Sequence, residues 1–255
     1  MTRVISVLSG KGGVGKTFLT ANLGISLAEM GKDVTVIDGN LTTPNLGLHL
    51  GMPIFPKTLH DVLKGRTRIH DAVYQHDSGL RIIPAGLSLS DLRGVDPHNL
   101  SSAILDLLGS SDIILIDSAA GLGREALASM ESSDETLLVT NPDLPSVLDV
   151  MKAARLARQM GTRVNGIVVN RHCGKGHELG ETMISGLVEA PIISRIPEST
   201  HVKESITART PLVKYKSGAP ASIEIRRLAA YLVDEPFEYM LPLGERIKRI
   251  LLGCR

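Results

Sequence analysis

A glycine-rich segment near the start of the chain constrains the fold more than any other feature of the sequence. The apolar run Val4–Leu8 leads into Gly10–Thr17, which has the spacing Gly-x-x-x-x-Gly-Lys-Thr and precedes a helical pattern. A strand, this loop and a helix in that order are typical of a phosphate-binding loop. Glycines permit positive φ angles, so backbone N–H groups can turn inward around an anion, and the helix N-terminus adds partial positive charge. The segment therefore predicts a site for nucleotide phosphates.

Two side chains of this segment have expected roles at the phosphates. Lys16 is expected to reach the β- and γ-phosphates, and the Thr17 hydroxyl to bind Mg²⁺. A second lysine, Lys11, lies inside the loop, where an ordinary phosphate loop has no need of it. The expected nucleotide-binding residues of the segment are Gly10, Lys11, Gly12, Gly13, Val14, Gly15, Lys16, Thr17 and Phe18.

Short β-branched runs alternate with helical stretches along most of the chain. The expected strands are Val4–Leu8, Asp33–Ile37, Leu80–Pro84, Asp112–Ile116, Thr136–Thr140, Val164–Val169 and Pro191–Ile196. The expected helices are Lys16–Met30, Asn99–Leu108, Arg124–Met130, Ser146–Met160, His177–Leu187 and Ser222–Leu232. Most strand runs are apolar throughout, as parallel strands covered on both faces are. The alternation predicts an α/β fold with a doubly wound, mostly parallel sheet and helices on both faces.

Composition and charge exclude several classes of protein. The 28 Lys and Arg residues against 27 Asp and Glu give a net charge of +1, so no overall basic field attracts nucleic acid. Two distant cysteines do not form a disulfide scaffold or a Cys-x-x-Cys site. No apolar run has the length of a signal-peptide core or a membrane span, and we expect a cytoplasmic protein. We expect one domain over residues 1–235 and a tail over residues 236–255.

The segment Lys11–Thr17 resembles the loop Lys-Gly-Gly-x-Gly-Lys-Thr of the deviant-Walker-A ATPases of the MinD/ParA family. The resemblance implies that the protein is an ATPase with ATP and Mg²⁺ as cofactors. It also implies that Lys11 crosses to the γ-phosphate of a partner subunit, so that ATP joins two copies of the chain. On this basis Lys11 and Lys16 are both expected to be catalytic.

The resemblance extends to the magnesium shell. Asp38 follows the second strand, and Asp117 ends the apolar run Ile113–Ile116, as the corresponding carboxylates of the family do. With Thr17, these two residues are the expected metal-binding set. Asp38 is also expected to be catalytic.

The resemblance assigns an adenine site to the ends of two later strands. Asn170 and Arg171 follow the run ending at Val169, where the family places an Asn against the base. Pro197 and Glu198 resemble the family's Ile-Pro-Glu-Asp loop, although Ser199 replaces the Asp. We expect these four residues to contact the nucleotide.

One departure from the family concerns catalysis. The family carries Asp-x-Asp after the second strand, whereas this chain has Asp38-Gly39-Asn40. An amide can hydrogen-bond a water molecule but cannot accept its proton. Asn40 is therefore expected to occupy a catalytic position, and hydrolysis to be slow.

An apolar stripe marks the C-terminal tail. It consists of Leu243, Ile247, Ile250 and Leu251, with basic residues around it. A short basic amphipathic helix suits an interfacial membrane anchor, and the tail also resembles the membrane-targeting helix of MinD proteins. A terminal helix that packs on the protein itself is the alternative.

Four functions fit this reading. The first is a MinD-like switch that positions a division or other cell-surface machine, with an unknown activator or cargo protein. The second is a ParA-type partitioning ATPase that binds DNA through Arg209, Lys214, Lys216, Arg226 and Arg227, although DNA binding is not the expectation. The third is a carrier of iron–sulfur clusters or nickel, for which Cys173 lacks a Cys-x-x-Cys partner. The fourth is a nucleotide-gated scaffold with very slow hydrolysis.

Overall fold

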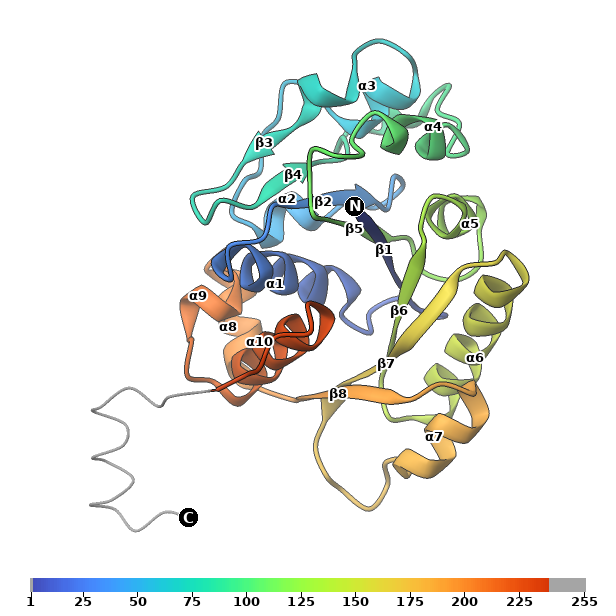
Figure 1. The fold of residues 1–255 in the computed structure, drawn as a ribbon, viewed down its shortest axis with the longest axis vertical. Coiled ribbons are helices and arrows are strands. Elements are labelled where there is room, and N and C mark those ends of the chain that lie inside the picture. The colour runs from blue at the N-terminus through green and yellow to red at the C-terminus, as the bar shows by residue number, and fades with distance from the viewer. Residues whose placement is uncertain (1, 239–255) are drawn as a thin grey trace.

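An eight-stranded sheet forms the centre of the structure, a computed structural model that describes residues 2–238 (Figure 1). Its strands are β1 (Arg3–Leu8), β2 (Val34–Gly39), β3 (Tyr74–Gln75), β4 (Arg81–Ile83), β5 (Ile113–Ser118), β6 (Glu135–Thr140), β7 (Arg163–His172) and β8 (Ile192–Pro197). The order across the sheet is β3-β4-β2-β5-β1-β6-β7-β8, and only the β3–β4 pair is antiparallel. This arrangement confirms the predicted doubly wound, mostly parallel sheet.

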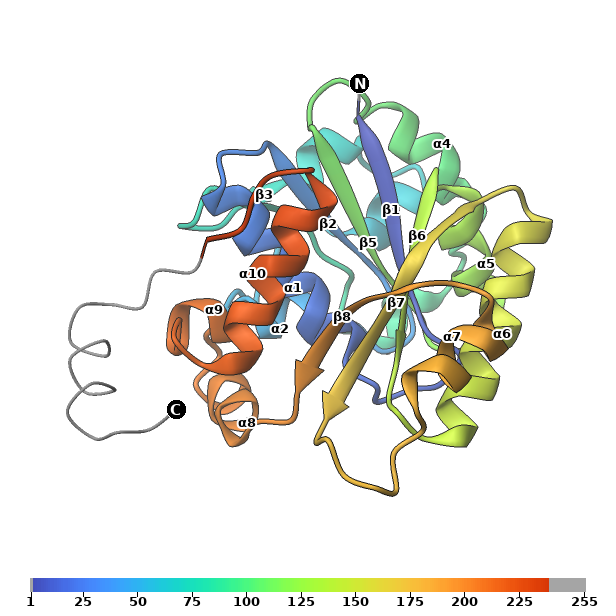
Figure 2. The same cartoon turned by 60° about the horizontal axis from the view of Figure 1, so that its bottom comes forward.

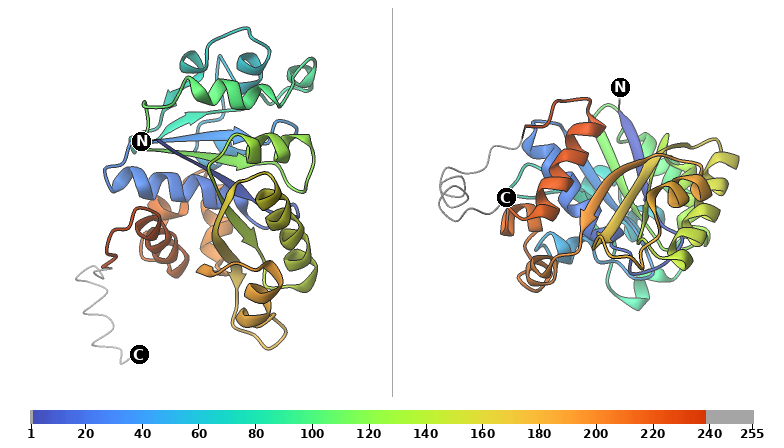
Figure 3. Two further views of the ribbon diagram at one scale, coloured as in Figure 1. Left: turned by 45° about the vertical axis from the view of Figure 1, so that its right-hand side comes forward. Right: turned by 90° about the horizontal axis from the view of Figure 1, so that it is seen from below.

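Helices cover both faces of the sheet. They are α1 (Lys16–Glu29), α2 (Leu46–His49), α3 (Leu59–Leu63), α4 (Asn99–Leu105), α5 (Arg124–Glu131), α6 (Leu144–Gln159), α7 (Glu181–Val188), α8 (Thr200–Thr207), α9 (Leu212–Tyr215) and α10 (Pro220–Leu232), with single 3-10 turns at Ile69–Ala72 and Leu89–Leu92. Figure 2 shows α1 and α10 side by side, and the right panel of Figure 3 shows α10 on one side of the sheet and α6 and α7 on the other.

The core consists of three apolar clusters of buried side chains. Strands β2, β5 and β6 are buried at every position, which explains their continuous apolar pattern. Helix α1 lies between the sheet and α10, and every residue from Phe18 to Leu27 is buried. Because α1 has no exposed face over this stretch, the start of the helix at Lys16 is held firmly against the strand ends.

The expected strands are all present, but several short elements were not predicted. Helices α2, α3 and α9 contain only 4 or 5 residues, too few for a helical period to appear in the sequence, and the eight-residue α8 was also not predicted. The two-residue strand β3 is equally short.

The helix expected from His177 begins later, at Glu181. The Glu178 carboxylate accepts backbone N–H groups of Cys173 (2.6 Å) and Gly174 (3.0 Å), which holds residues 173–178 as a loop. The helix is present, but its predicted start was wrong, because a side chain that binds nearby backbone N–H groups competes with helix formation.

The predicted tail lies mostly outside the described residues. The expected membrane stripe at Leu243, Ile247, Ile250 and Leu251 falls among residues 239–255, which the structure does not describe. None of the helices between residues 2 and 238 is long and apolar enough to cross a bilayer.

Candidate nucleotide site

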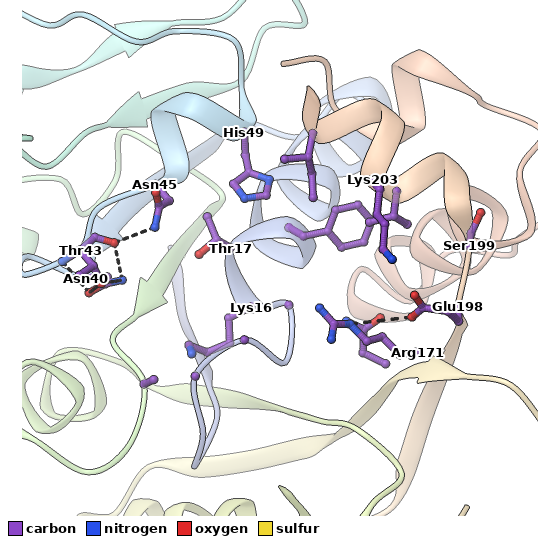
Figure 4. Close-up of a pocket in the computed structure, with 18 of the residues that line it drawn as sticks. Lys16, Thr17, Asn40, Thr43, Asn45, His49, Arg171, Glu198, Ser199 and Lys203 are labelled. Atoms are coloured by element: carbon purple, nitrogen blue, oxygen red, sulfur yellow. Dashed lines mark hydrogen bonds and ion pairs between the residues drawn. The ribbon is translucent and has the colours of Figure 1, made fainter. Parts of the chain in front are cut away.

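A cavity of about 380 Å³ opens at the carboxyl ends of the parallel strands, beside the start of α1 (Figure 4). The strand β1 that feeds it lies between β5 and β6, where the sheet order changes direction, and open α/β sheets bind ligands at such points. The structure brings most of the predicted residues to this cavity: Gly12, Gly13, Gly15, Lys16, Thr17, Phe18, Asn40, Asn170, Arg171, Pro197 and Glu198.

The loop before α1 has the backbone geometry of an anion site. Gly13 and Gly15 have φ angles of 78° and 98°, values that side-chain-bearing residues rarely adopt. Gly15 is also the N-cap of α1, so the first free N–H groups of the helix face the cavity region. Gly10 packs so closely on α6 that a Cβ atom there would lie 2.1 Å from the backbone carbon of Asp149. Packing on both sides thus fixes the loop.

Lys16 is buried in this loop, with only 8% of the residue exposed. Its Nζ donates to the Ser9 hydroxyl at 2.7 Å. Burial lowers the pKa of the Lys16 ammonium, and the nearby charge of Asp117 acts in the opposite direction. An anion bound here would favour the charged form of Lys16, because it would add an opposite charge next to the ammonium.

Two acidic residues lie behind the loop. Asp38 and Asp117 are directly paired in the register of β2 and β5, and each is at most 1% exposed. Burial raises the pKa of Asp117 to about 6, although hydrogen bonds with Thr17 and Thr20 and the charge of Lys16 act to lower it. Burial and the charge of Asp117 raise the pKa of Asp38 well above its usual range. The pair is therefore a site that a cation would stabilise.

The residues fit the expected magnesium ion. Asp117 Oδ2 is buried and has no hydrogen-bond partner among the described residues, which leaves one carboxylate oxygen without a polar contact. Within residues 2–238 no three His, Cys, Asp or Glu side chains gather closely enough to hold a metal alone. Mg²⁺ usually binds through one or two carboxylates, waters and substrate phosphates, so two carboxylates beside a phosphate loop suit it.

The opposite end of the cavity is formed by β7 and β8. Asn170 is 5% exposed, and its Nδ2 donates to the Val14 carbonyl oxygen at 2.6 Å. Arg171 adopts a φ of 57°, unusual for a residue other than glycine, and its guanidinium lies 3.8 Å from the Glu198 carboxylate. Figure 4 shows this ion pair across the cavity from Asn40 and Thr43.

Several cavity residues were not among those expected to bind the nucleotide. They are Thr43, Asn45, His49, Ser118, Ala120, Ser199, Val202, Lys203 and Ile206. His49 lies on α2, and Val202, Lys203 and Ile206 on α8, helices without a sequence signal. Conversely, Gly10, Lys11, Val14, Asp38 and Asp117 do not line this cavity, and Lys11 is exposed.

The structure also places the residues of the alternative functions. Of the basic residues considered for DNA binding, Lys214 and Arg226 both contact Glu29 at 2.5 Å, and Arg227 pairs with Glu224. Three of these five basic residues are thus paired with two carboxylates. Cys173 is exposed and is the one cysteine within residues 2–238.

Comparisons with known proteins agree with this geometry. A family model described as ParA, NUBPL iron-transfer P-loop NTPase, matches residues 1–233. An uncharacterised ATP-binding protein of Methanocaldococcus jannaschii is 37% identical over 94% of this chain and 91% of its own. The septum site-determining protein MinD of Pyrococcus horikoshii, solved with Mg-ADP, is 36% identical with a TM-score of 0.88, covering 91% of this chain and 96% of that one. The matching chain of the MinC:MinD cell division protein complex of Aquifex aeolicus is 31% identical with a TM-score of 0.83, covering 94% of this chain and 98% of that one.

Proposed function

Because this chain belongs to the MinD/ParA family of P-loop ATPases, we propose that it binds and hydrolyses ATP and uses the bound nucleotide to switch between two assembly states. The observation that carries the proposal is the buried Lys16 in a phosphate loop directly in front of the paired Asp38 and Asp117.

Each residue of this group has a distinct task. Lys16 holds the β- and γ-phosphates, while Thr17, Asp38 and Asp117 hold magnesium directly or through water. Magnesium, when bound, neutralises charge on the phosphates. Asn170, Arg171, Pro197 and Glu198 form the end of the cavity proposed for the base.

Lys11 is the basis for proposing a dimer. It is exposed and stands apart from the residues that line the cavity of its own chain. A lysine at this edge of the loop can serve a phosphate of a second copy, as the family resemblance implies. The ATP-bound form would then be a homodimer with both nucleotides at the interface.

We further propose that the dimer associates peripherally with membranes and positions another machine of the cell surface. The stripe of Leu243, Ile247, Ile250 and Leu251 supports this, with four basic residues against one acidic residue in 243–255. One short helix binds a bilayer weakly, whereas two linked copies gain avidity. The MinD relatives, named as septum site-determining and cell division proteins, support the same role.

Sedimentation with anionic liposomes tests this function. The full chain should sediment with ATP and Mg²⁺ and remain in the supernatant with ADP or without nucleotide. Deleting residues 243–255 should abolish sedimentation while ATP binding persists. Ile250→Glu should act likewise, because a charge on the apolar stripe opposes insertion, whereas Arg255→Lys should preserve binding. Retention of the truncated protein on double-stranded DNA with ATP would favour the partitioning function instead.

A further inference from the structure

The loop that follows β2 encloses the Asp38 carboxylate. Backbone N–H groups of Asn45 (3.1 Å) and Leu46 (3.0 Å) donate to Oδ2, and that of Asn40 (3.3 Å) donates to Oδ1. The position of this carboxylate therefore depends on the conformation of residues 40–46.

A closed turn shapes the first half of this loop. Asn40 Nδ2 donates to the Thr43 carbonyl oxygen (2.7 Å) and hydroxyl (3.0 Å), and Asn40 Oδ1 accepts from the Thr43 backbone N–H (3.2 Å). Both ends of the Asn40 amide are thus used within the loop. Of the two residues between Asn40 and Thr43, Leu41 is buried and Thr42 is exposed.

Thr42 connects the turn to a different part of the chain. Its hydroxyl donates to Glu125 Oε1 at 2.5 Å, and its backbone N–H donates to Glu125 Oε2 at 3.4 Å. Glu125 lies in the first turn of α5, just after the segment 118–123 that follows Asp117. No ion pair occupies the Glu125 carboxylate within residues 2–238, whereas its neighbour Arg124 pairs with Asp96 at 3.3 Å.

The loop of residues 40–46 also separates two cavities. A second cleft of about 480 Å³ lies beside the nucleotide cavity, and it is lined by Thr42 and Glu125 together with apolar residues such as Leu92 and Val95. Asn40, Thr43 and Ala120 line both cavities. Leu41 anchors one residue of the turn in the apolar core, whereas Asn40 and Thr43 have space on both sides and depend on hydrogen bonds for their position.

We propose that Glu125 is a positioning residue for hydrolysis: by holding Thr42 it fixes the loop 40–46 and thereby places the Asp38 carboxylate. The inference rests on the proposed ATPase function and assigns Glu125 no contact with the nucleotide. Glu125 connects the segment after β2 to the segment after β5. These two strands carry Asp38 and Asp117, so the contact keeps the two carboxylates in one relative arrangement.

Paired variants of Thr42 test the proposal in the full-length protein. Thr42→Val removes the hydroxyl with little change in shape, and Thr42→Ser retains a donor to Glu125. One lost hydrogen bond of ordinary strength corresponds to a rate change of about fivefold. Thr42→Val should lower kcat for Mg·ATP by about that factor and change KM and nucleotide affinity by less than about twofold. Thr42→Ser should behave as the parent protein does.

A double-mutant cycle identifies Glu125 as the partner. Glu125→Ala should lower kcat alone, and its effect should be clearly smaller in a Thr42→Val background, where only the long contact from the Thr42 backbone N–H is left to lose. Equal kcat for the Val and Ser variants, or additive effects in the cycle, would overturn the proposal. So would a fall in melting temperature that accounts for the lost activity.

Hydrogen exchange provides a readout that does not need hydrolysis. The amides of Asn45 and Leu46 should exchange faster in Thr42→Val than in Thr42→Ser, because both donate to Asp38. If the parent protein binds no ATP or does not hydrolyse it, the proposed function fails. Exchange then decides the inference alone, and equal exchange in the two variants refutes it.

Discussion

Asp38 and Asp117 are paired in the register of β2 and β5, and both carboxyl groups are buried. They lie near the carboxyl ends of these strands, where Lys16 and Thr17 begin α1. Two carboxylates this close repel each other when ionised, and burial removes the water that would screen them. The fold therefore maintains an arrangement that is costly without a cation. A bound divalent cation would offset this repulsion, so the pair suits a functional state that contains one.

The two lysines of the phosphate loop should differ in effect. Lys16→Ala should abolish nucleotide binding, because it removes the buried charge from the phosphate site. Lys11→Ala should bind nucleotide with nearly unchanged affinity and fail to dimerise with ATP. Titration with a fluorescent ATP analogue measures binding, and light scattering measures assembly. A Lys11→Ala protein that still dimerises would falsify the proposed contact between subunits.

Asn40→Asp should raise the rate of hydrolysis. The carboxylate can still accept the Thr43 backbone N–H, while the oxygen that replaces Nδ2 cannot donate to the Thr43 carbonyl and is repelled by it, which favours a turn of this oxygen toward water. Water-activating groups typically contribute about 10²–10⁴-fold, so even partial recovery should give an increase of about tenfold. Single-turnover hydrolysis at saturating Mg·ATP measures this, with dimer fraction measured alongside. An unchanged rate at equal dimer fraction would show that residue 40 does not limit the reaction.

Alanine at two glycines of the loop should have different effects on the free energy of unfolding. Gly10→Ala should destabilise the protein by about 1–3 kcal/mol, because its Cβ would lie 2.1 Å from the Asp149 backbone carbon of α6. Gly12→Ala is the matched control, since its Cβ would meet nothing nearer than Ala120 at 3.8 Å. Chemical denaturation without nucleotide measures both. Equal stabilities of the two variants would contradict this account of the packing.

His60 should make stability depend on pH. It is 1% exposed in α3, and its Nδ1 accepts the Gly86 N–H at 2.9 Å. Burial lowers the pKa of His60, so the folded state binds fewer protons than the unfolded state. Its contribution to stability is therefore present above the usual pKa near 6.5 and is lost as pH falls below it.

The control for this prediction is His60→Asn, which can still accept from Gly86 but does not titrate. Between pH 7.5 and 5.5 the melting temperature of the parent protein should fall further than that of the variant. Both proteins retain His49 and His76, whose pKa values are lowered in the same direction, so the difference between the two proteins isolates His60. Parallel melting curves at all pH values would rule out the assignment.

The parts of the site that could be predicted from sequence are local. Lys16 and Thr17 belong to one continuous motif, and Asp38 and Asp117 each end an apolar strand that is easy to recognise. Parallel strands then bring such ends together, whatever the separation along the chain.

The parts that could not be predicted depend on contacts between distant residues or on short helices. Position 40 was identified as important, yet only the structure shows that its amide binds Thr43. Nothing in the sequence relates Thr42 to Glu125, because that contact depends on how the loop after β2 meets the first turn of α5. His49 and Lys203 reach the cavity from helices too short to leave a periodic pattern.

The contact between Asn170 and the phosphate loop limits how this site can change over time. Asn170 Nδ2 donates to Val14 and lies where a Cβ on Gly15 would be, only 2.3 Å from it. Any larger residue at 15 would collide with Asn170, and a residue without a donor at 170 would leave the buried Val14 carbonyl unpaired. The end of the cavity proposed for the base is thus tied to the phosphate loop, and a descendant of this protein could alter one only by a compensating change in the other.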